Sequence, residues 1–276
     1  MRRTIVGVGL IAALAVPHLG HAAVSPWVGT ADYTAGTNGV AGADVVGSFD
    51  AYDAGPGVAL TLGVGAARVG SVLNGYFQSY VTAHTLNSVE VPSNSLNKQG
   101  AAGSGAGYEL TVAANFTEEV TAINGGQTDF NVTGGHVDLY LDTPNYSFGG
   151  DSGFTDGGSI LSGTIVVGGG TFTTSPFFSF GGALIGLVVD SYDTAIFEPD
   201  TILAGASVFT LQITPNNTQF LSGISKVQGH AYNSGQDLLV VADGNLDFLA
   251  VPEPLSLLLV GSAGVGLLAL RRRMRG

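Results

Sequence analysis

Apolar and polar side chains alternate along much of this chain, and this two-residue period constrains the fold more than any other feature. In GYELTVAANF from Gly107, GHVDLYLD from Gly135 and SVFTLQIT from Ser207, apolar residues take every second position. The pattern predicts strands that bury one face. Between residues 24 and 250 we find no long run with the helical period of 3.6 residues. We therefore predict an all-β body.

Further strands are predicted between clusters of Gly, Asn, Asp and Thr, which are typical of turns. They are GVALTLGV from Gly57, GYFQSYVT from Gly75, SILSGTIVV from Ser159, ALIGLVVD from Ala183 and DLLVVAD from Asp237. A sheet with one wet face must bury the other face against a partner. The prediction is a two-sheet β-sandwich of jelly-roll type.

One body over residues 24–250 has to be stable through its core alone, because the chain contains no cysteine and hence no disulfide. The whole chain has 43 glycines and 10 prolines among 276 residues. Together they stay below the share of about 25–30% that indicates disorder. The single tryptophan, Trp27, stands at the start of this body. There we expect it to plug one end of the core.

The body is strongly acidic. Residues 24–250 hold 20 of the 21 acidic residues, and their only basic residues are Arg68, Lys98 and Lys226. Such a surface repels nucleic acid, whose binding relies on basic side chains, while it favours solubility and attracts cations. Nucleic acid is therefore excluded as a partner.

Both ends of the chain carry targeting signals. Residues 1–23 have two arginines, an apolar stretch over residues 5–16 and small residues at the end, as a secretory signal peptide has. Residues 255–270 are uncharged and largely apolar, and Arg271, Arg272, Arg273 and Arg275 follow them. The positive-inside rule favours a transmembrane helix with this cationic flank in the cytoplasm. The alternative is a buried C-terminal helix of a soluble domain.

The C-terminal residues 251–276 resemble a known sorting signal. The motif Val251-Pro252-Glu253-Pro254, then the apolar segment, then the arginine cluster is similar to the PEP-CTERM signal of Gram-negative bacteria. The resemblance implies export across the inner membrane, temporary anchoring in that membrane by the C-terminal helix, and processing by exosortase, a membrane-embedded transpeptidase. The final location would be the cell surface or the extracellular matrix of a biofilm.

A second resemblance concerns the body. The order GYFQSYVTAHTL, GYELTVAANFTEEV, GGHVDLYLD and FTDGGSIL over about residues 75–165 is similar to flocculation-associated PEP-CTERM proteins. This likeness implies a role in holding cells and exopolysaccharide together. It brings no catalytic residues with it.

The motifs of common enzymes are missing. We find no Gly-x-Ser-x-Gly, phosphate-loop or His-Glu-x-x-His pattern. The body's histidines, His84, His136 and His230, are isolated in sequence and are expected on polar strand faces. Glu118 and Glu119 are adjacent, so on a strand they would point to opposite faces and could not act as a pair. We therefore predict a protein that is not an enzyme.

Calcium is the ion that best fits the acidic turns. Asp243, Asn245 and Asp247 take the first, third and fifth places of an EF-hand-like loop, and Asp151 and Asp156 share the loop DSGFTDGG. Alternating oxygen side chains in a loop can converge on one cation. The sixth place of the first loop, however, is Phe248 rather than glycine, and the alternative for both segments is a plain turn.

Tyrosines at strand spacing offer a means of binding sugar. Tyr76 and Tyr80 would share one face of a strand, and Tyr140 lies on another. Exposed rings stack on sugars, whereas core packing is the alternative. Taken together, the sequence predicts a surface or matrix protein that contacts exopolysaccharide. The competing prediction is a secreted carbohydrate-active hydrolase with the same sorting tail.

Overall fold

Each of the eight predicted strand segments forms a strand of one closed sheet. The computed structural model describes residues 25–36, 40–99, 107–174, 179–202, 206–213 and 218–250. The eight strands of the ring are β4 (Ala51–Thr61), β5 (Val72–Leu86), β7 (Glu109–Asn124), β8 (Gln127–Asp142), β9 (Gly158–Thr174), β10 (Ser179–Tyr192), β12 (Ala206–Ile213) and β15 (Leu238–Ala250). The all-β prediction is thus confirmed.

Shorter elements lie outside this ring. They are β1 (Ser25–Pro26), β2 (Gly29–Asp32), β3 (Val45–Phe49), the 3₁₀ turn η1 (Val64–Ala66), β6 (Val89–Val91), β11 (Phe197–Glu198), α1 (Thr218–Leu221), β13 (Lys226–Val227) and β14 (His230–Ala231). Strands β2, β3 and β11 form a separate sheet, and β13 pairs with β14 in a hairpin.

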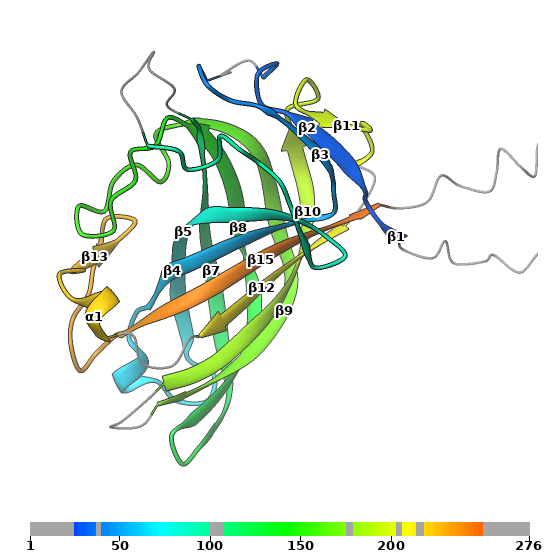
Figure 1. Cartoon of the computed structure of the whole chain (residues 1–276). Helices are drawn as coiled ribbons and strands as arrows, with labels where there is room; N and C mark the ends of the chain where they lie inside the picture. The colour runs from blue at the N-terminus through cyan, green and yellow to red at the C-terminus, as the bar shows by residue number, and fades with distance from the viewer. Residues whose placement is uncertain are drawn as a thin grey trace, which may run out of the picture. The chain divides into compact units, whose positions relative to one another are not determined.

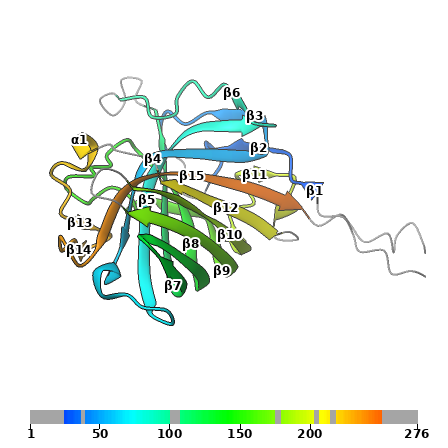
Figure 2. The same ribbon diagram turned by 90° about the horizontal axis from the view of Figure 1, so that it is seen from below.

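The ring follows the chain order. Each strand pairs antiparallel with the next one along β4-β5-β7-β8-β9-β10-β12-β15, and β15 then pairs with β4. Consecutive antiparallel strands need only short connections. Figures 1 and 2 show these strands curving round a common interior. The result is an up-and-down, barrel-like sheet.

This arrangement differs from the predicted two-sheet jelly roll. Alternation requires only that each strand bury one face, and a sheet closed on itself satisfies that requirement as well as two packed sheets do. All of these strands except β12 are also longer than predicted, up to the 17 residues of β9. Bulges interrupt the pairing, for instance between Ala242 and Gly244 on β15, and bulges bend a strand in the way that closure needs.

Inward-facing side chains fill the ring and make the main core. On β7 these are Leu110, Val112 and Ala114, all fully buried, as the alternation predicted. Phe77 and Phe209 meet across the interior with ring centroids 5.6 Å apart. A Cβ at Gly244 would lie 3.1 Å from both rings, so an added side chain at this strand position would press on both of them.

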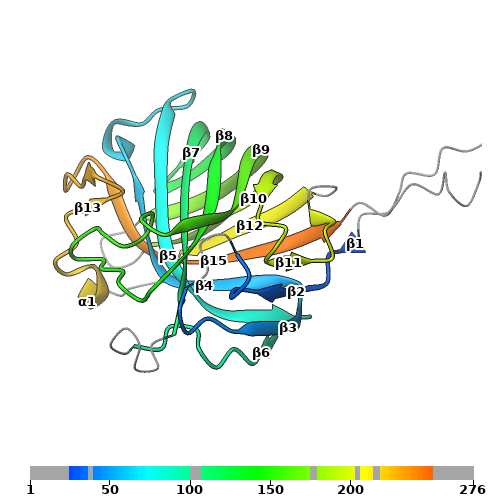
Figure 3. The same cartoon turned by 90° about the horizontal axis from the view of Figure 1, so that it is seen from above.

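Aromatic residues close one end of the ring. Trp27 is 1% exposed and packs edge-on against Phe49, Phe197 and Phe248, with centroids 5.5 to 6.3 Å away. Its indole nitrogen donates a hydrogen bond to the Pro199 carbonyl, 3.1 Å away. The expected plug is confirmed, although it closes a ring rather than a sandwich. Strands β2, β3 and β11 lie together, away from α1 and β13 (Figures 1 and 3).

A second, smaller core lies on the outer face. Val58 and Leu60 of β4 pack there against Ile224 and Val227 from the segment around β13. This cluster holds the β13–β14 hairpin against the ring.

Residues 24–252 form one compact unit. The predicted signal peptide, the predicted sorting motif Val251 to Pro254 and the arginines 271–273 and 275 lie outside the described residues. None of the helices within the described ranges is long and apolar enough to span a bilayer.

Candidate functional site

A groove runs over the outer face of β5, β7 and β8. Its volume is about 370 Å³. Tyr76 of β5 pairs in register with Asn115 of β7, which pairs with His136 of β8. Directly opposed residues of neighbouring strands point to the same side of a sheet. The groove floor is therefore formed by Tyr76, Asn115 and their neighbours Asn74 and Thr117.

The β13–β14 hairpin makes one wall of this groove through Gln228 and His230. The imidazole of His230 stacks on the ring of Tyr76, with centroids 3.9 Å apart and planes inclined by 20°. The Gln228 amide donates to the carbonyls of Phe77 and Ala114, at 2.7 and 3.1 Å. These bonds fix the wall to the floor.

The edge of the groove at β8 consists of Gly134 and Gly135. A Cβ at Gly135 would collide with the Asn115 carbonyl, and the positive φ of 140° also favours glycine. At Gly134 an added Cβ would have the Thr117 hydroxyl, 4.0 Å away, as its nearest neighbour. The groove is thus open because this edge carries no side chains.

The three predicted sugar-stacking tyrosines lie on this outer face but not in one site. Tyr76 lines the groove. Tyr80 stacks on Tyr146, with centroids 4.5 Å apart, as Tyr76 stacks on His230, so the chain itself covers one face of each ring. Tyr140 is level with Tyr80, one strand beyond Thr111, and is half-buried. The Thr111 hydroxyl donates to the Phe154 carbonyl at 2.8 Å, so the loop after β8 crosses this row.

Asp151 acts as an internal crosslink. Its Oδ1 accepts hydrogen bonds from the Gln78 amide and from the backbone N–H of Gln228, at 3.0 and 2.8 Å, and its Oδ2 accepts from the N–H of Gly229 at 2.8 Å. Lys226 Nζ lies 3.8 Å from Oδ2. The predicted calcium ligand therefore fastens its loop and the hairpin to β5.

Asp156 lies near Asp151, and both line a second groove of about 590 Å³. Both oxygens of Asp151 accept hydrogen bonds from the protein. Asp156 instead accepts from the Asn145 amide at 3.4 Å.

The predicted loop with Asp243, Asn245 and Asp247 is wrong as a loop, because these residues lie in β15. They project on the outer face, since Ala242, Gly244 and Leu246 between them are buried. Alternate residues of a strand are about 6.6–6.8 Å apart, so their oxygens do not converge as those of a calcium loop do. No group of three or more His, Cys, Asp or Glu in the described ranges could hold a metal ion.

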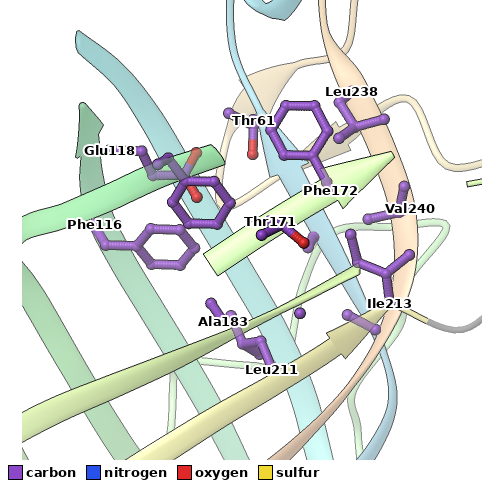
Figure 4. Close-up of a pocket in the computed structure, with 14 residues that line it drawn as sticks. Thr61, Phe116, Glu118, Thr171, Phe172, Ala183, Leu211, Ile213, Leu238 and Val240 are labelled. Carbon is purple, nitrogen blue, oxygen red and sulfur yellow. The ribbon is translucent and has the colours of Figure 1, made fainter. Parts of the chain in front are cut away.

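A pocket inside the ring was not predicted. It has a volume of about 40 Å³, and its walls are mostly apolar. Figure 4 shows Phe116 and Glu118 of β7 on one side and Ile213, Leu238 and Val240 on the opposite side. The remaining lining residues are Ala59, Thr61, Phe130, Thr171, Phe172, Gly182, Ala183, Leu211 and Ala242.

Glu118 is the one ionisable group among the lining residues of this pocket. It is 4% exposed. Burial raises its pKa to about 7, and a hydrogen bond from the Thr61 hydroxyl opposes part of that rise. Its Oε2 has no hydrogen-bond partner within the described part of the chain. Buried polar groups are nearly always paired, so an unpaired carboxylate oxygen requires an explanation.

The adjacent glutamates behave as the alternation predicted. Glu119 is exposed on the outer face while Glu118 points inward. One signal for Glu118 was therefore present in the sequence, because it continues the inward series of Val112, Ala114 and Phe116. His84 departs from its prediction, since it is fully buried rather than on a polar face.

Comparisons with known proteins found no family model, no curated protein and no solved structure that matches this chain.

Proposed function

We propose that this chain is an exported, non-enzymatic protein of the cell surface or extracellular matrix that holds exopolysaccharide through the groove over β5, β7 and β8. The observation that carries the proposal is the lining of this groove. An aromatic pair, Tyr76 and His230, stands beside the neutral side chains of Asn74, Asn115 and Thr117. Aromatic faces and fixed amides are the groups that hold the apolar faces and the hydroxyls of sugar rings.

The charge of the body limits the kind of polymer. Residues 24–250 hold 20 acidic residues and three basic ones, so charge attraction cannot hold an acidic polysaccharide. The groove lining itself carries no Asp, Glu, Lys or Arg among the described residues. We infer that it takes a neutral segment of the polymer.

The route to the surface rests on the sequence. The resemblance of residues 251–276 to the PEP-CTERM signal supports sorting by exosortase, with the C-terminal helix in the membrane before processing. The likeness of residues 75–165 to flocculation-associated proteins supports a role in biofilm or flocs. Groove and tail then have separate tasks: one holds polymer, and the other delivers the protein.

The test compares cell aggregation and cell-bound polysaccharide among strains. One lacks the protein, one makes a chain without residues 251–276, and one makes the double variant Tyr76→Ala, Gly134→Leu, which removes the ring and places a side chain in the groove. Tyr140→Ala is the matched control because Tyr140 lies outside the groove.

We expect the first three strains to release polysaccharide and to aggregate poorly, while growth and polymer synthesis continue. The Tyr140→Ala strain should behave as the parent. If the deletion strain keeps its polymer, the matrix role is wrong. If only the groove variant keeps it, the role stands and the groove is wrong.

A further inference from the structure

The pocket inside the ring has a shape and a polarity that the proposed matrix role does not use. Its lining includes the strand ends Thr61, Leu238 and Ile213, whereas the groove lies on the outer face. Small residues on neighbouring strands, among them Ala59, Ala183 and Ala242, leave the space that larger side chains occupy elsewhere in the ring.

Glu118 is an unusual group to find at such a place. An unpaired carboxylate oxygen in apolar surroundings costs about 1–3 kcal/mol or more, yet Glu118 Oε2 is unpaired and the side chain is 4% exposed. Phe116 and Phe130 line the same pocket. A ligand that donates a hydrogen bond to Oε2 would remove this cost, so the carboxyl is a ready recognition point.

The charge and the size of the pocket define the ligand. A carboxylate prefers a cation, aromatic rings attract cations over their faces, and the acidic body attracts cations from solution. A volume of about 40 Å³ corresponds to a few atoms, since one water needs about 10–15 Å³ by the same measure. An ammonium group with a short alkyl chain meets both conditions.

We propose that the inner pocket binds a small primary alkylammonium ion, with its ammonium group on Glu118 and its chain against Phe116, Phe172 and Leu211. The ammonium donates to Oε2, and the chain extends toward the opening between β4, β12 and β15. This site is independent of the polysaccharide groove, because the two share only Phe116 among their lining residues.

Calorimetric titration of the purified full chain at pH 8 tests the proposal. The probes are butylammonium, butan-1-ol and butanoate, which share a chain and differ in their head group. We expect butylammonium to bind at least about tenfold more tightly than butan-1-ol, as a charge-assisted hydrogen bond implies. Butanoate should not bind.

Two variants assign the site. Glu118→Gln should lose the preference for butylammonium, and Ala183→Leu, which fills the pocket, should lose binding of both butylammonium and butan-1-ol. Glu119→Gln is the matched control, because its side chain is exposed on the outer face. The proposal is overturned if butylammonium and butan-1-ol bind equally well, if Glu118→Gln keeps the preference, or if no probe binds.

Discussion

The two ends of the closed sheet are filled in different ways. At one end, aromatic side chains from β3, β11 and β15 pack with Trp27. Tyr52 of β4 packs against two of them, Phe49 and Phe248, and all three are fully or almost fully buried. At the other end, alanines and a glycine on the same ring of strands leave a pocket. The difference shows that side-chain size, rather than strand pairing, decides whether the interior of a ring is filled or open.

His84 at the aromatic end and Glu118 at the open end are both buried, and burial favours the neutral form of each. His84 accepts or donates a hydrogen bond at Nε2 with the Tyr33 hydroxyl, 2.6 Å away, and Tyr33 also bonds to the Tyr52 hydroxyl at 2.7 Å. Burial lowers the pKa of His84 to about 3, whereas it raises that of Glu118 to about 7. The ends are therefore expected to respond to pH in opposite directions.

The largest effect should come from the aromatic end. Trp27→Ala removes a buried indole with three aromatic neighbours, and we expect it to lower the free energy of unfolding by about 3–5 kcal/mol. Urea denaturation followed by circular dichroism measures the change. The adjacent Val28→Ala is the control, since Val28 is 47% exposed, and it should stay within about 0.5 kcal/mol of the parent. Equal effects of both variants would show that this end is not a packed plug.

The open end should show a gain in stability. A carboxyl whose pKa is higher in the folded state than in the unfolded state stabilises the fold below its unfolded pKa, and this stabilisation is lost as the pH rises through the folded pKa. For Glu118 the loss lies between the ordinary pKa of 4.5 and about 7. The glutamine in Glu118→Gln stays neutral at every pH. At pH 8 the free energy of unfolding of this variant should therefore exceed that of the parent by up to about 3 kcal/mol.

The same comparison at pH 4.5 should give a small difference, because Glu118 is then protonated in the folded state and still about half protonated in the unfolded state. Urea midpoints at the two pH values measure it. Glu119→Gln controls for the removal of a charge from the adjacent exposed position. A gain that is equal at pH 4.5 and pH 8 would contradict the raised pKa of Glu118.

Tyr33→Phe tests the polar contacts inside the aromatic end. The ring volume is nearly kept, but His84 and Tyr52 lose their shared hydroxyl partner. A buried group left without its partner costs about 1–3 kcal/mol, and we expect a loss of this size in urea denaturation at pH 7. Tyr232→Phe, in the outer cluster at β13, is the control and should change stability less. A neutral Tyr33→Phe would show that these hydroxyls contribute little.

The contribution of His84 to the stability of this end changes with pH in the opposite direction to that of Glu118. His84 has a lower pKa folded than unfolded, so its contribution is complete above the ordinary value of 6.5 and falls as the pH drops toward about 3. The contribution of His84 to the parent's stability should therefore fall below about pH 6, opposite in sign to the contribution of Glu118. The variant His84→Gln should lose less free energy of unfolding than the parent between pH 6 and pH 3, measured by urea denaturation. Equal losses in the two proteins would contradict the burial of a neutral His84.

The strands could be predicted from the sequence, but the pairing of β15 with β4 that closes the ring could not. Alternation on β7 identifies which side chains enter the core, including Glu118 as the opposite of Glu119. It does not say that β15 pairs with β4, because Leu246 needs a buried face in a sandwich and in a ring alike. Strand order depends on contacts between residues as distant as Tyr52 and Leu246, which no local pattern records.

The candidate sites were predicted less well for a related reason. Asp243 and Asp247 have the spacing of a calcium loop, but the strand propensity of the surrounding Val240, Val241 and Leu246 prevails. Asp151 is a crosslink because the hairpin with Gln228 folds back onto it from 77 residues away. The groove needs Tyr76 and His230 side by side, and only the folded chain brings them together.

The smallest expected effect concerns the hydrogen bond between Thr61 and Glu118 at the open end. Thr61→Val removes the hydroxyl that bonds to Glu118, and a hydrogen bond to a charged carboxylate is stronger than one to a neutral carboxyl. We therefore expect a loss of about 1 kcal/mol at pH 8 and about half of that at pH 5, measured as urea midpoints. Thr171→Val, the other hydroxyl of the pocket lining, is the control and should show no dependence on pH. If Thr61→Val is equally costly at both pH values, then Glu118 does not change its charge between them, and the contrast between the two ends reduces to one of packing.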